Sequence, residues 1–442
     1  MDFYLPQSVS MIIDKLEYNG FEAYIVGGCV RDSILGKKPN DYDIATSAAP
    51  HEVKKCLYGY KTIDTGIKHG TVTVVVNGEN IEVTTFRIDG AYEDNRHPKD
   101  IEFSTDIVDD LSRRDFTINA MAYNPRTGLI DSFNAQKDLF NRKISCVGEP
   151  SVRFSEDALR IMRALRFSSQ LGFEIEKTTA LAIHDMKHLL TNISKERIAK
   201  ELELLLNGIS PSDVLTEFAD VFEVIIPEIG PCIGFNQHNR YHVYDVWTHT
   251  AEAIEHSKPL PYVRLALMLH DIAKPLCFRL DDEGNGHFFN HEKQSAELAE
   301  VILRDLRFSN ETIENVCTLI KYHYVTPVDD YKVVRRLIST VGEELFPLLL
   351  EVMRGDNRAK QSFCFELVQT VDAMQAKGDE IIADKQCLKV SDLAVNGNDM
   401  LELGYTGIEI GNMLDLLLNN VIDEKIKNER EVLLEFARSK KL

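Results

Sequence analysis

The 442-residue sequence lacks several features that mark special classes of protein. No apolar run approaches the roughly 18 residues needed to span a bilayer, and no basic segment followed by an apolar one opens the chain, so we expect neither a membrane span nor a secretory signal. The eight cysteines are scattered, without a Cys-x-x-Cys pair, which indicates reduced thiols and a cytoplasmic location. Internal repeats and low-complexity tracts are also missing, which argues against fibrous and disordered classes.

The sequence also contains fewer basic than acidic residues. The sequence has 50 Lys and Arg residues against 70 Asp and Glu residues, a formal net charge of −20. Because affinity for nucleic-acid phosphates comes mostly from Lys and Arg, this balance excludes a chain that binds polyanions over its whole surface. Any nucleic-acid site must be a local basic path on an acidic body. The hydrophobic share of 44% and charged share of 27% are typical of a folded globular protein.

The pattern of apolar residues changes along the chain. Residues 1–145 mix helical and strand patterns, including two β-rich runs at 71–76 and 81–87 joined by Asn77-Gly78, a strong hairpin signal. From Ser155 onward, apolar residues recur at helical spacing almost to the end. The sequence therefore predicts an α/β head followed by a long helical remainder.

Two aspartates follow a Gly-Gly turn in the head. Gly27-Gly28 comes after an apolar run, and Asp41 and Asp43 lie about thirteen residues further on. An Asp-x-Asp segment on a strand places both carboxylates on one face, where they can hold a pair of Mg²⁺ ions. The Gly-Gly turn at a helix start offers N–H groups to a triphosphate. Either motif alone is compatible with an ordinary turn or a solvated loop, but their order favours a metal–nucleotide site.

Further polar residues of the head can complete such a site. Glu82, in an otherwise apolar strand, is the candidate third carboxylate, although an exposed strand face explains it equally well. Arg113 and Arg114 can grip phosphates, and Asp115 and Asn119 can bond ribose hydroxyls. The alternative is the first turn of a helix with ordinary surface charge.

Five motifs appear in a characteristic order: Gly27-Gly28-x-x-Arg31-Asp32, Asp41 with Asp43, Gly66-Ile67-Lys68-His69-Gly70-Thr71, Arg113-Arg114-Asp115, and Glu156-Asp157-Ala158-Leu159-Arg160. Over roughly residues 20–205, this series resembles the bacterial class II tRNA nucleotidyltransferases, the CCA-adding enzymes and their poly(A) polymerase relatives. The resemblance implies an α/β nucleotidyltransferase head (polymerase-β-like, with a mixed sheet, 1–145), an all-α neck (146–208), an HD-type body (209–365) and a tail contacting tRNA (366–442).

The resemblance also implies an activity: template-free addition of C, C and A to the 3′ end of tRNA from CTP and ATP, with Mg²⁺ in a two-metal mechanism. The catalytic residues would be Asp41, Asp43 and Glu82. The implied nucleotide-binding residues are Gly27, Gly28, Arg31, Arg113, Arg114, Asp115, Asn119, Glu156, Asp157, Arg160 and Arg163. Relatives that add only CC, only A, or poly(A) remain alternatives. The polar loop 91–102, with Asp94 and Arg96, favours complete CCA addition.

The segment around Asp157 and Arg160 can select the base, as the resemblance implies. Three residues apart on a helix that we expect to begin near Ser155, the two side chains would share a face. A carboxylate acceptor beside a guanidinium donor matches the edge that cytosine and adenine present, whereas uracil and guanine present the reverse. The plainer alternative is that Glu156 and Asp157 favour a helix N-terminus through its dipole.

A second group of candidate ligands lies in the helical remainder. His270-Asp271 follows an apolar run, with His249 upstream and with His291, His323 and Asp356 downstream. Converging imidazoles and carboxylates can bind one or two divalent cations and activate water. The order resembles the HD phosphohydrolases, whose ligands would map to His249, His270, Asp271 and Asp356, with Asp329 or Asp330 as substitutes for the last. A metal-dependent phosphohydrolase acting on cyclic or terminal phosphates is therefore the competing function from another class.

Two further features bear on RNA binding. Arg160, Arg163 and Arg166 form a helical stripe that can serve as local basic surface, and glycines in 396–399 and 403–411 allow close approach of an RNA phosphate, although they also punctuate helices. The sequence leaves the oligomeric state open.

Overall fold

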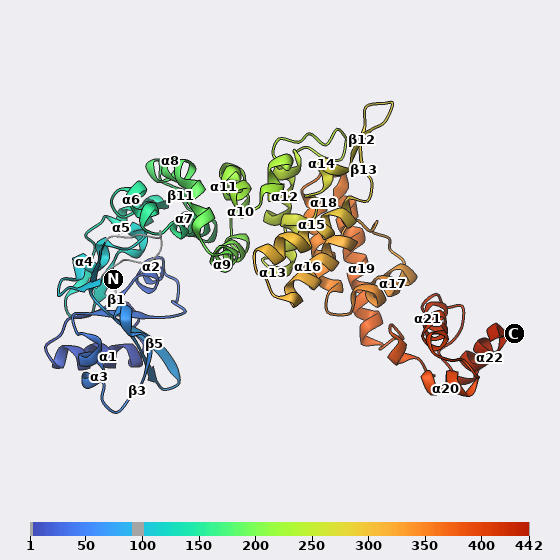
Figure 1. Ribbon diagram of the computed structural model, residues 1–442, viewed down its shortest axis with the longest axis horizontal. Coiled ribbons are helices and arrows are strands. Elements are labelled where there is room, and N and C mark those ends of the chain that lie inside the picture. Colours follow the sequence, from blue (N-terminus) through green and yellow to red (C-terminus); the bar gives the residue numbers. More distant parts are fainter. Residues whose placement is uncertain (1–2, 91–100, 442) are drawn as a thin grey trace. The chain divides into compact units, whose positions relative to one another are not determined.

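The computed structural model describes residues 3–90 and 101–441, and the structural statements below concern those residues. The chain divides into two compact units, Met1–Pro227 and Glu228–Leu442, which we describe separately. Figure 1 shows the sheet in the blue, N-terminal part of the chain and helices through most of the rest.

A seven-stranded mixed sheet is the centre of the head. Its strands are β1 (Ala23–Val26), β2 (Asp43–Thr46), β3 (Lys61–Gly66), β4 (Thr71–Val76), β5 (Glu79–Thr85), β8 (Ala122–Asn124) and β9 (Gly128–Ile130). Their order is β3-β4-β5-β2-β1-β8-β9, and neighbours are antiparallel except for the parallel pair of β2 and β5. A short pair, β6 (Arg87–Asp89) with β7 (Ile101–Phe103), lies apart from this sheet. The predicted α/β head with a mixed sheet is confirmed.

The predicted hairpin in this sheet is confirmed as well. Asn77 and Gly78, with φ angles of 52° and 85°, form the two-residue turn between β4 and β5. Positive φ at both positions is what a type I′ turn requires, and Asn-Gly adopts it at little cost. The second strand runs over Glu79–Thr85 rather than the predicted 81–87, because pairing extends up to the turn itself.

Short helices surround the sheet: α1 (Gln7–Tyr18), α2 (Gly28–Ile34), α3 (Pro50–Cys56), α4 (Ile107–Ser112), the 3₁₀ turn η2 (Thr117–Asn119) and α5 (Ala135–Asn141). Helix α1 shows why they dock. Its Val9, Ile12, Ile13 and Leu16 recur at helical spacing and are at most 2% exposed, packed toward β1, β2 and α3. Each such burial contributes about 1.5–3 kcal/mol.

The neck continues the first unit. It contains α6 (Pro150–Glu156), α7 (Leu159–Leu171), α8 (Lys177–Met186) and α9 (Lys195–Leu206). The first unit continues past residue 208 with α10 (Pro211–Glu217) and α11 (Ala219–Ile225), and β10 (Lys143–Ile144) pairs with β11 (Glu174–Ile175). Helix α7 packs along α9, and most of its residues are buried. This pairing brings polar residues of α9 next to the segment predicted to select the base.

The second unit is almost wholly helical. Its body contains α12 (Val246–Glu255), α13 (Pro261–Leu269), α14 (Lys274–Cys277), α15 (His291–Asp305), α16 (Asn310–Tyr322), α17 (Tyr331–Val341), α18 (Phe346–Arg358) and α19 (Phe365–Ala383). The polar segment 281–285 connects β12 (Phe278–Leu280) and β13 (Gly286–Phe288), which form a small hairpin.

The tail has a hydrophobic cluster of its own. It is built from α20 (Gly397–Glu402), α21 (Ile408–Ile422) and α22 (Arg430–Lys441). Met400, Leu417 and Leu433 are fully buried there, and the Tyr405 hydroxyl donates to the Ala437 carbonyl oxygen at 2.7 Å. The glycine-containing segments predicted to approach RNA therefore lie at the starts of packed helices.

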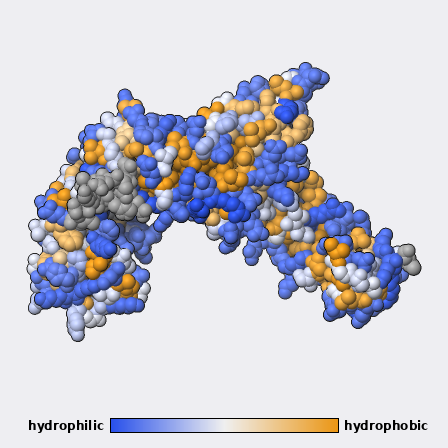
Figure 2. Space-filling model, viewed as in Figure 1, coloured by the Kyte–Doolittle hydropathy of each residue, from blue (hydrophilic) through white to orange (hydrophobic). Residues whose placement is uncertain are grey.

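Within residues 3–90 and 101–441, no helix is both long and apolar enough to cross a membrane. All eight cysteines are free thiols. On the face shown in Figure 2, hydrophilic residues predominate and hydrophobic ones lie in smaller groups between them.

Candidate functional site

A cavity of about 490 Å³ in the first unit brings most of the predicted nucleotide-site residues together. It is lined by Gly27, Gly28, Asp41, Asp43, Arg113, Arg114, Asp115, Asn119, Asp157, Arg160, Arg163, Arg166 and Phe167. These residues come from the head and from the neck, where Asp157 precedes α7 and the others belong to it, so neck and head share one site.

The carboxylates of this cavity stand at the start of β2. Asp43 is the first residue of the strand, and Glu82 lies opposite it in the parallel ladder with β5. The expectation that Asp41 shares the strand was wrong: it precedes β2, although it lines the same cavity as Asp43. Desolvation by the surrounding chain, with repulsion from Asp41 and Glu82, raises the pKa of Asp43 to about 6. Repulsion of this kind is relieved by a bound divalent cation.

Two arginines face the carboxylates and are held by a residue that the sequence analysis missed. Asp110, on α4, accepts from Arg113 Nε at 3.0 Å and NH2 at 2.7 Å, and from Arg114 NH2 at 3.0 Å. Burial alone would raise the pKa of Asp110, but Arg114 and Arg113 outweigh it and hold the pKa below its usual value. The signal was available, since Asp110 lies three and four residues before the arginines.

Gly27 has a clear steric role. Its φ of 77° is a conformation that other residues adopt at a cost, and a Cβ there would lie 3.1 Å from Arg114 NH1. The glycine therefore lets an arginine guanidinium lie against the backbone just before α2.

Asp115 and Asn119 organise the arginines around them. Asp115 is 8% exposed and accepts from Arg163 at 2.7 Å (Nε) and 2.6 Å (NH2), and from the Phe116 N–H at 2.8 Å. These partners, above all Arg163, overcome the effect of burial and lower the pKa of Asp115 to about 2. Asn119 Oδ1 accepts from Arg31 NH1 at 2.8 Å. The two residues thus link guanidinium groups from α2 and α7.

The arrangement of Asp157 and Arg160 differs from the expected helix face. Helix α6 ends at Glu156 and α7 begins at Leu159, and Asp157 between them has extended backbone angles of −139° and 102°. The helix breaks because Asp157 Oδ1 accepts the Leu159 N–H at 3.1 Å, as a capping side chain does. Both side chains nevertheless line the cavity.

Arg160 is held by acceptors of the neck and the head. Its NH1 lies 2.6 Å from Glu156 Oε2, and its NH2 donates to the Arg113 carbonyl oxygen at 3.0 Å. Arg160 is only 9% exposed, so these bonds fix its guanidinium.

Phe167, which the sequence analysis did not single out, lies among three guanidinium groups. The central carbons of Arg31, Arg163 and Arg166 are 5.3, 5.4 and 4.2 Å from its ring centroid. These are cation–π distances. The loop with Asp94 and Arg96 lies outside the described residues.

The second unit contains a buried cluster of histidines and aspartates. His249 on α12 lies 3.1 Å from Asp356 on α18 and 3.5 Å from Asp271, and His270 Nε2 lies 3.0 Å from Asp271 Oδ2. His291, the first residue of α15, lies 3.4 Å from Asp271. All are at most 4% exposed.

With His323, which follows α16, six residues converge: the four mapped as HD ligands and the two further downstream histidines, His291 and His323. Two groups of three have ligand atoms within 4.8 Å of one another, and both include Asp271: His249, His270 and Asp271, and Asp271, His291 and His323. Asp329 and Asp330 lie elsewhere, the first paired with Lys377 and the second accepting the Val333 N–H.

Unsatisfied atoms in this cluster suit a cation. His270 Nε2, His291 Nε2 and both oxygens of Asp271 are buried and make no hydrogen bond of good geometry among the described residues, although Lys274, His270 and His291 approach Asp271 to within 3.4 Å. Burial lowers the pKa of His323 to about 3, which leaves it neutral and able to ligate. Imidazole nitrogens with carboxylate oxygens are ligands for Zn²⁺, Mn²⁺ or related metals.

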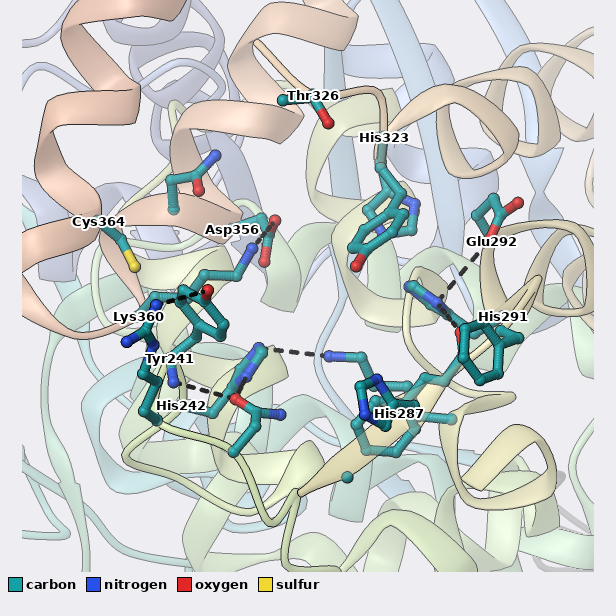
Figure 3. Close-up of a pocket in the computed structure, with 18 of the residues that line it drawn as sticks. Tyr241, His242, His287, His291, Glu292, His323, Thr326, Asp356, Lys360 and Cys364 are labelled. Atoms are coloured by element: carbon teal, nitrogen blue, oxygen red, sulfur yellow. Dashed lines mark hydrogen bonds and ion pairs between the residues drawn. The ribbon is translucent and has the colours of Figure 1, made fainter. Parts of the chain in front are cut away.

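Two lysines neutralise the negative charges of Asp271 and Asp356. Lys274 Nζ lies 2.7 Å from Asp271, and Lys360 Nζ lies 2.6 Å from Asp356. The sequence analysis missed them, although they follow their partners by three and four residues. In Figure 3, His291, His323 and Asp356 point toward a common space, and Lys360 reaches to Asp356.

This space opens into a cavity of about 910 Å³ with aromatic residues at its edge. Tyr241, Phe289 and Tyr324 line it and are 45%, 66% and 63% exposed. The rings of His287 and Phe289 are stacked with centroids 5.5 Å apart. Exposed rings of this kind offer apolar faces to a planar ligand.

Family models match three parts of the chain. The model of the poly A polymerase head domain matches residues 23–145, the probable RNA and SrmB-binding site of polymerase A matches residues 172–232, and the putative tRNA nucleotidyltransferase domain 2 matches residues 287–437.

Whole-chain similarity extends to curated relatives. The CCA-adding enzyme of Lactiplantibacillus plantarum is 34% identical over 98% of this chain and 96% of its own length. The CCA-adding enzyme of Enterococcus faecalis is 32% identical over 97% and 95%.

Solved structures agree. The Bacillus stearothermophilus CCA-adding enzyme in complex with CTP aligns with a TM-score of 0.75 and 28% identity over 98% of this chain and 97% of that chain. The Thermotoga maritima CCA-adding enzyme complexed with tRNA shares the fold, with a TM-score of 0.60 and 21% identity over 100% and 97%.

Proposed function

The chain belongs to the family of CCA-adding enzymes, and we propose that it adds C, C and A to the 3′ end of tRNA from CTP and ATP without a nucleic-acid template. The observation that carries this proposal is one cavity with acidic residues at the start of β2 and arginines from the head and neck around them. Such a cavity can hold a metal-bound triphosphate beside a base-selecting wall.

We propose Asp41 and Asp43 as ligands of the catalytic divalent metal, taken as Mg²⁺, with Glu82 completing the acidic group. The raised pKa of Asp43 supports this fit, because crowded carboxylates gain from a cation. When bound, Mg²⁺ supplies the acidity that activates the RNA 3′-hydroxyl and neutralises the departing pyrophosphate. Arg113 and Arg114, already oriented by Asp110, are placed to hold triphosphate oxygens bidentately.

Nucleotide choice is assigned to Asp157 and Arg160. The Asp157 carboxylate accepts from an exocyclic amine, and the Arg160 guanidinium donates to a ring acceptor, a pattern shared by cytosine and adenine. A uracil or guanine would leave these groups unpaired, at about 1–3 kcal/mol each. The break between α6 and α7 leaves this proposal intact, since both side chains line the cavity.

Primer extension tests the proposal. Purified protein with Mg²⁺ is given tRNA ending at the discriminator base, at C or at CC, with CTP, ATP or both. Successive C, C and A products are expected. Products that stop at CC, that require a CC end, or that grow into long A ladders would identify a relative with a narrower activity.

The histidine–aspartate cluster favours a second candidate function, a metal-dependent phosphohydrolase of the HD type. The buried imidazole nitrogens of His270 and His291, which lack well-formed hydrogen bonds, support a site for one or two divalent cations, with Asp271 common to both ligand groups. Lys274 and Lys360 can bind phosphate oxygens, and the exposed rings can hold a base. Release of a monoester from a nucleoside 2′,3′-cyclic phosphate, dependent on added Mn²⁺ or Ni²⁺, is the expected result.

We retain the four-part division (1–145, 146–208, 209–365, 366–442), tRNA contact by the tail and a cytoplasmic location as proposals. Truncation after Asp384, which leaves α19 packed on α17 and α18, followed by tRNA binding at several salt concentrations, tests the tail. Loss of tRNA affinity with unchanged nucleotide binding would support it.

A further inference from the structure

Two charged residues on one face of α9 contact residues that line the nucleotide cavity. Arg197 and Glu201 are four residues apart, so they lie on the same side of the helix. Arg197 NH2 donates to Asp157 Oδ2 at 2.9 Å, and Glu201 Oε2 lies 3.1 Å from Arg166 Nε. Neither Arg197 nor Glu201 is among the described residues that line the cavity.

The partners of these two residues do line the cavity. Arg197 completes the restraint of Asp157, whose other oxygen accepts the Leu159 N–H. Each carboxylate oxygen keeps a free lone pair, because a carboxylate has about four acceptor positions. Glu201 is 6% exposed, and its other oxygen lies 3.9 Å from Arg163 NH1, so it attracts two arginines of α7 at once.

We propose that Arg197 and Glu201 are positioning residues that set nucleotide choice without touching the nucleotide. Arg197 fixes the direction in which Asp157 presents its acceptor, and Glu201 restrains Arg163 and Arg166 of α7 by charge attraction. The inference rests on the proposed role of Asp157 in base selection and adds α9 to the selecting apparatus.

The physical reason is the geometry of the break between α6 and α7. Asp157 is outside both helices, and its carboxylate is held by the Leu159 N–H on one oxygen and by Arg197 on the other. Without Arg197, one oxygen is released and the carboxylate turns about the remaining bond to Leu159. A carboxylate that turns is a less selective acceptor for the exocyclic amine of the base. Discrimination between CTP and UTP then falls by roughly tenfold or more, as for loss of a charged hydrogen bond.

Single-nucleotide incorporation on tRNA ending at the discriminator base tests this. For the full-length chain, kcat and KM are measured with CTP and with UTP for Arg197→Met, Arg197→Lys and Glu201→Gln. Lys200→Met and Glu196→Gln, exposed residues of the same helix, are the matched controls. We expect Arg197→Met to lower the CTP-over-UTP ratio of kcat/KM by about tenfold or more, Glu201→Gln to lower it less, and Arg197→Lys to restore part of it. Both controls should keep the wild-type ratio.

Asp157→Ala separates this inference from the function on which it rests. If Asp157→Ala leaves the ratio unchanged, the proposed role of Asp157 fails. If Asp157→Ala lowers the ratio but Arg197→Met and Arg197→Lys slow CTP and UTP incorporation equally, only the role of Arg197 fails. The double variant should lose no more discrimination than Asp157→Ala alone, because the two residues act through one carboxylate. Thermal melting of each variant shows whether it is folded. If Arg197→Met is not folded, the nucleotide ratio of Arg197→Lys decides the role of Arg197.

Discussion

The carboxylates at the start of β2 and those of the histidine–aspartate cluster differ in what surrounds them. Asp41, Asp43 and Glu82 are exposed, and their mutual repulsion contributes to the raised pKa of Asp43. Asp271 and Asp356 are buried, and each is paired with a lysine.

This difference indicates two kinds of cation site. An exposed acidic group attracts a hydrated cation that arrives and leaves with its nucleotide, as Mg²⁺ usually does. A buried group of imidazoles and neutralised carboxylates has to give up lysine contacts to ligate, which favours a resident metal of higher affinity. The two sites should therefore respond differently to substitution, chelation and pH.

The largest expected effect follows removal of a carboxylate from the head. Asp43→Ala and Asp41→Ala should each slow primer extension by about 10³-fold, because a metal ligand contributes several kcal/mol to the transition state. The rate of C addition at saturating Mg²⁺ is the measurement. Asp64→Ala, an exposed acid of β3 paired with Lys54, is the control. A normal rate in both cavity variants would remove the basis of the proposed function.

His270→Ala should give the opposite pattern. We expect metal affinity of the cluster to fall by roughly a hundredfold or more, since even indirect partners of a metal cost 10- to 100-fold, while extension stays within about twofold of wild type. Calorimetric titration with Mn²⁺ and the extension assay provide the two readouts. His256→Ala, an exposed histidine that follows α12, should change neither. Loss of extension in His270→Ala would show that the two sites are coupled.

Asp110→Asn tests the support of the head arginines. Breaking this buried pair should lower the free energy of unfolding by about 3 kcal/mol at pH 7. Because the pKa of Asp110 is lowered, its stabilisation is present above the ordinary value near 3.9 and is lost as the pH falls through the folded-state pKa. Urea unfolding between pH 2 and 7 should thus show the two proteins converging in acid. A constant difference would assign the effect to packing instead.

The smallest effect concerns pH and the head metal. A pKa of about 6 for Asp43 means that its carboxyl is increasingly protonated below pH 6 in the metal-free protein. Mg²⁺ affinity should fall by at most about tenfold per pH unit there and level off above pH 7. The same raised pKa means that ionising Asp43 lowers stability as the pH rises from about 4 to 6. Asp43→Asn should remove the pH dependence of both Mg²⁺ affinity and stability. A wild-type Mg²⁺ affinity that does not change from about pH 5 to 7 would contradict the assignment of Asp43 as a metal ligand.

Local signals in the sequence predicted much of the head. Asn77-Gly78 specifies its turn through the backbone preferences of two residues, so the hairpin could be predicted without the rest of the fold. The order of the glycine, aspartate and arginine motifs identified the residues that meet in the cavity.

Long-range contacts limited the prediction elsewhere. The segment around Asp157 has a helical pattern on both sides, but its side chain caps the start of α7 and bonds Arg197, 40 residues away. No spacing rule connects those two positions. Similarly, His-Asp adjacency drew attention to His270 and Asp271 and to the downstream histidines His291 and His323, whereas the two overlapping ligand groups around Asp271 depend on how α15 and α16 pack.

The electrostatic potential of the cavity depends in part on Phe167, an uncharged side chain. One ring, 6% exposed, is shared by three cations that would otherwise repel one another. A leucine there would keep an apolar side chain but remove the negative face of the ring, so the positive potential offered to a triphosphate is set in part by a residue that carries no charge.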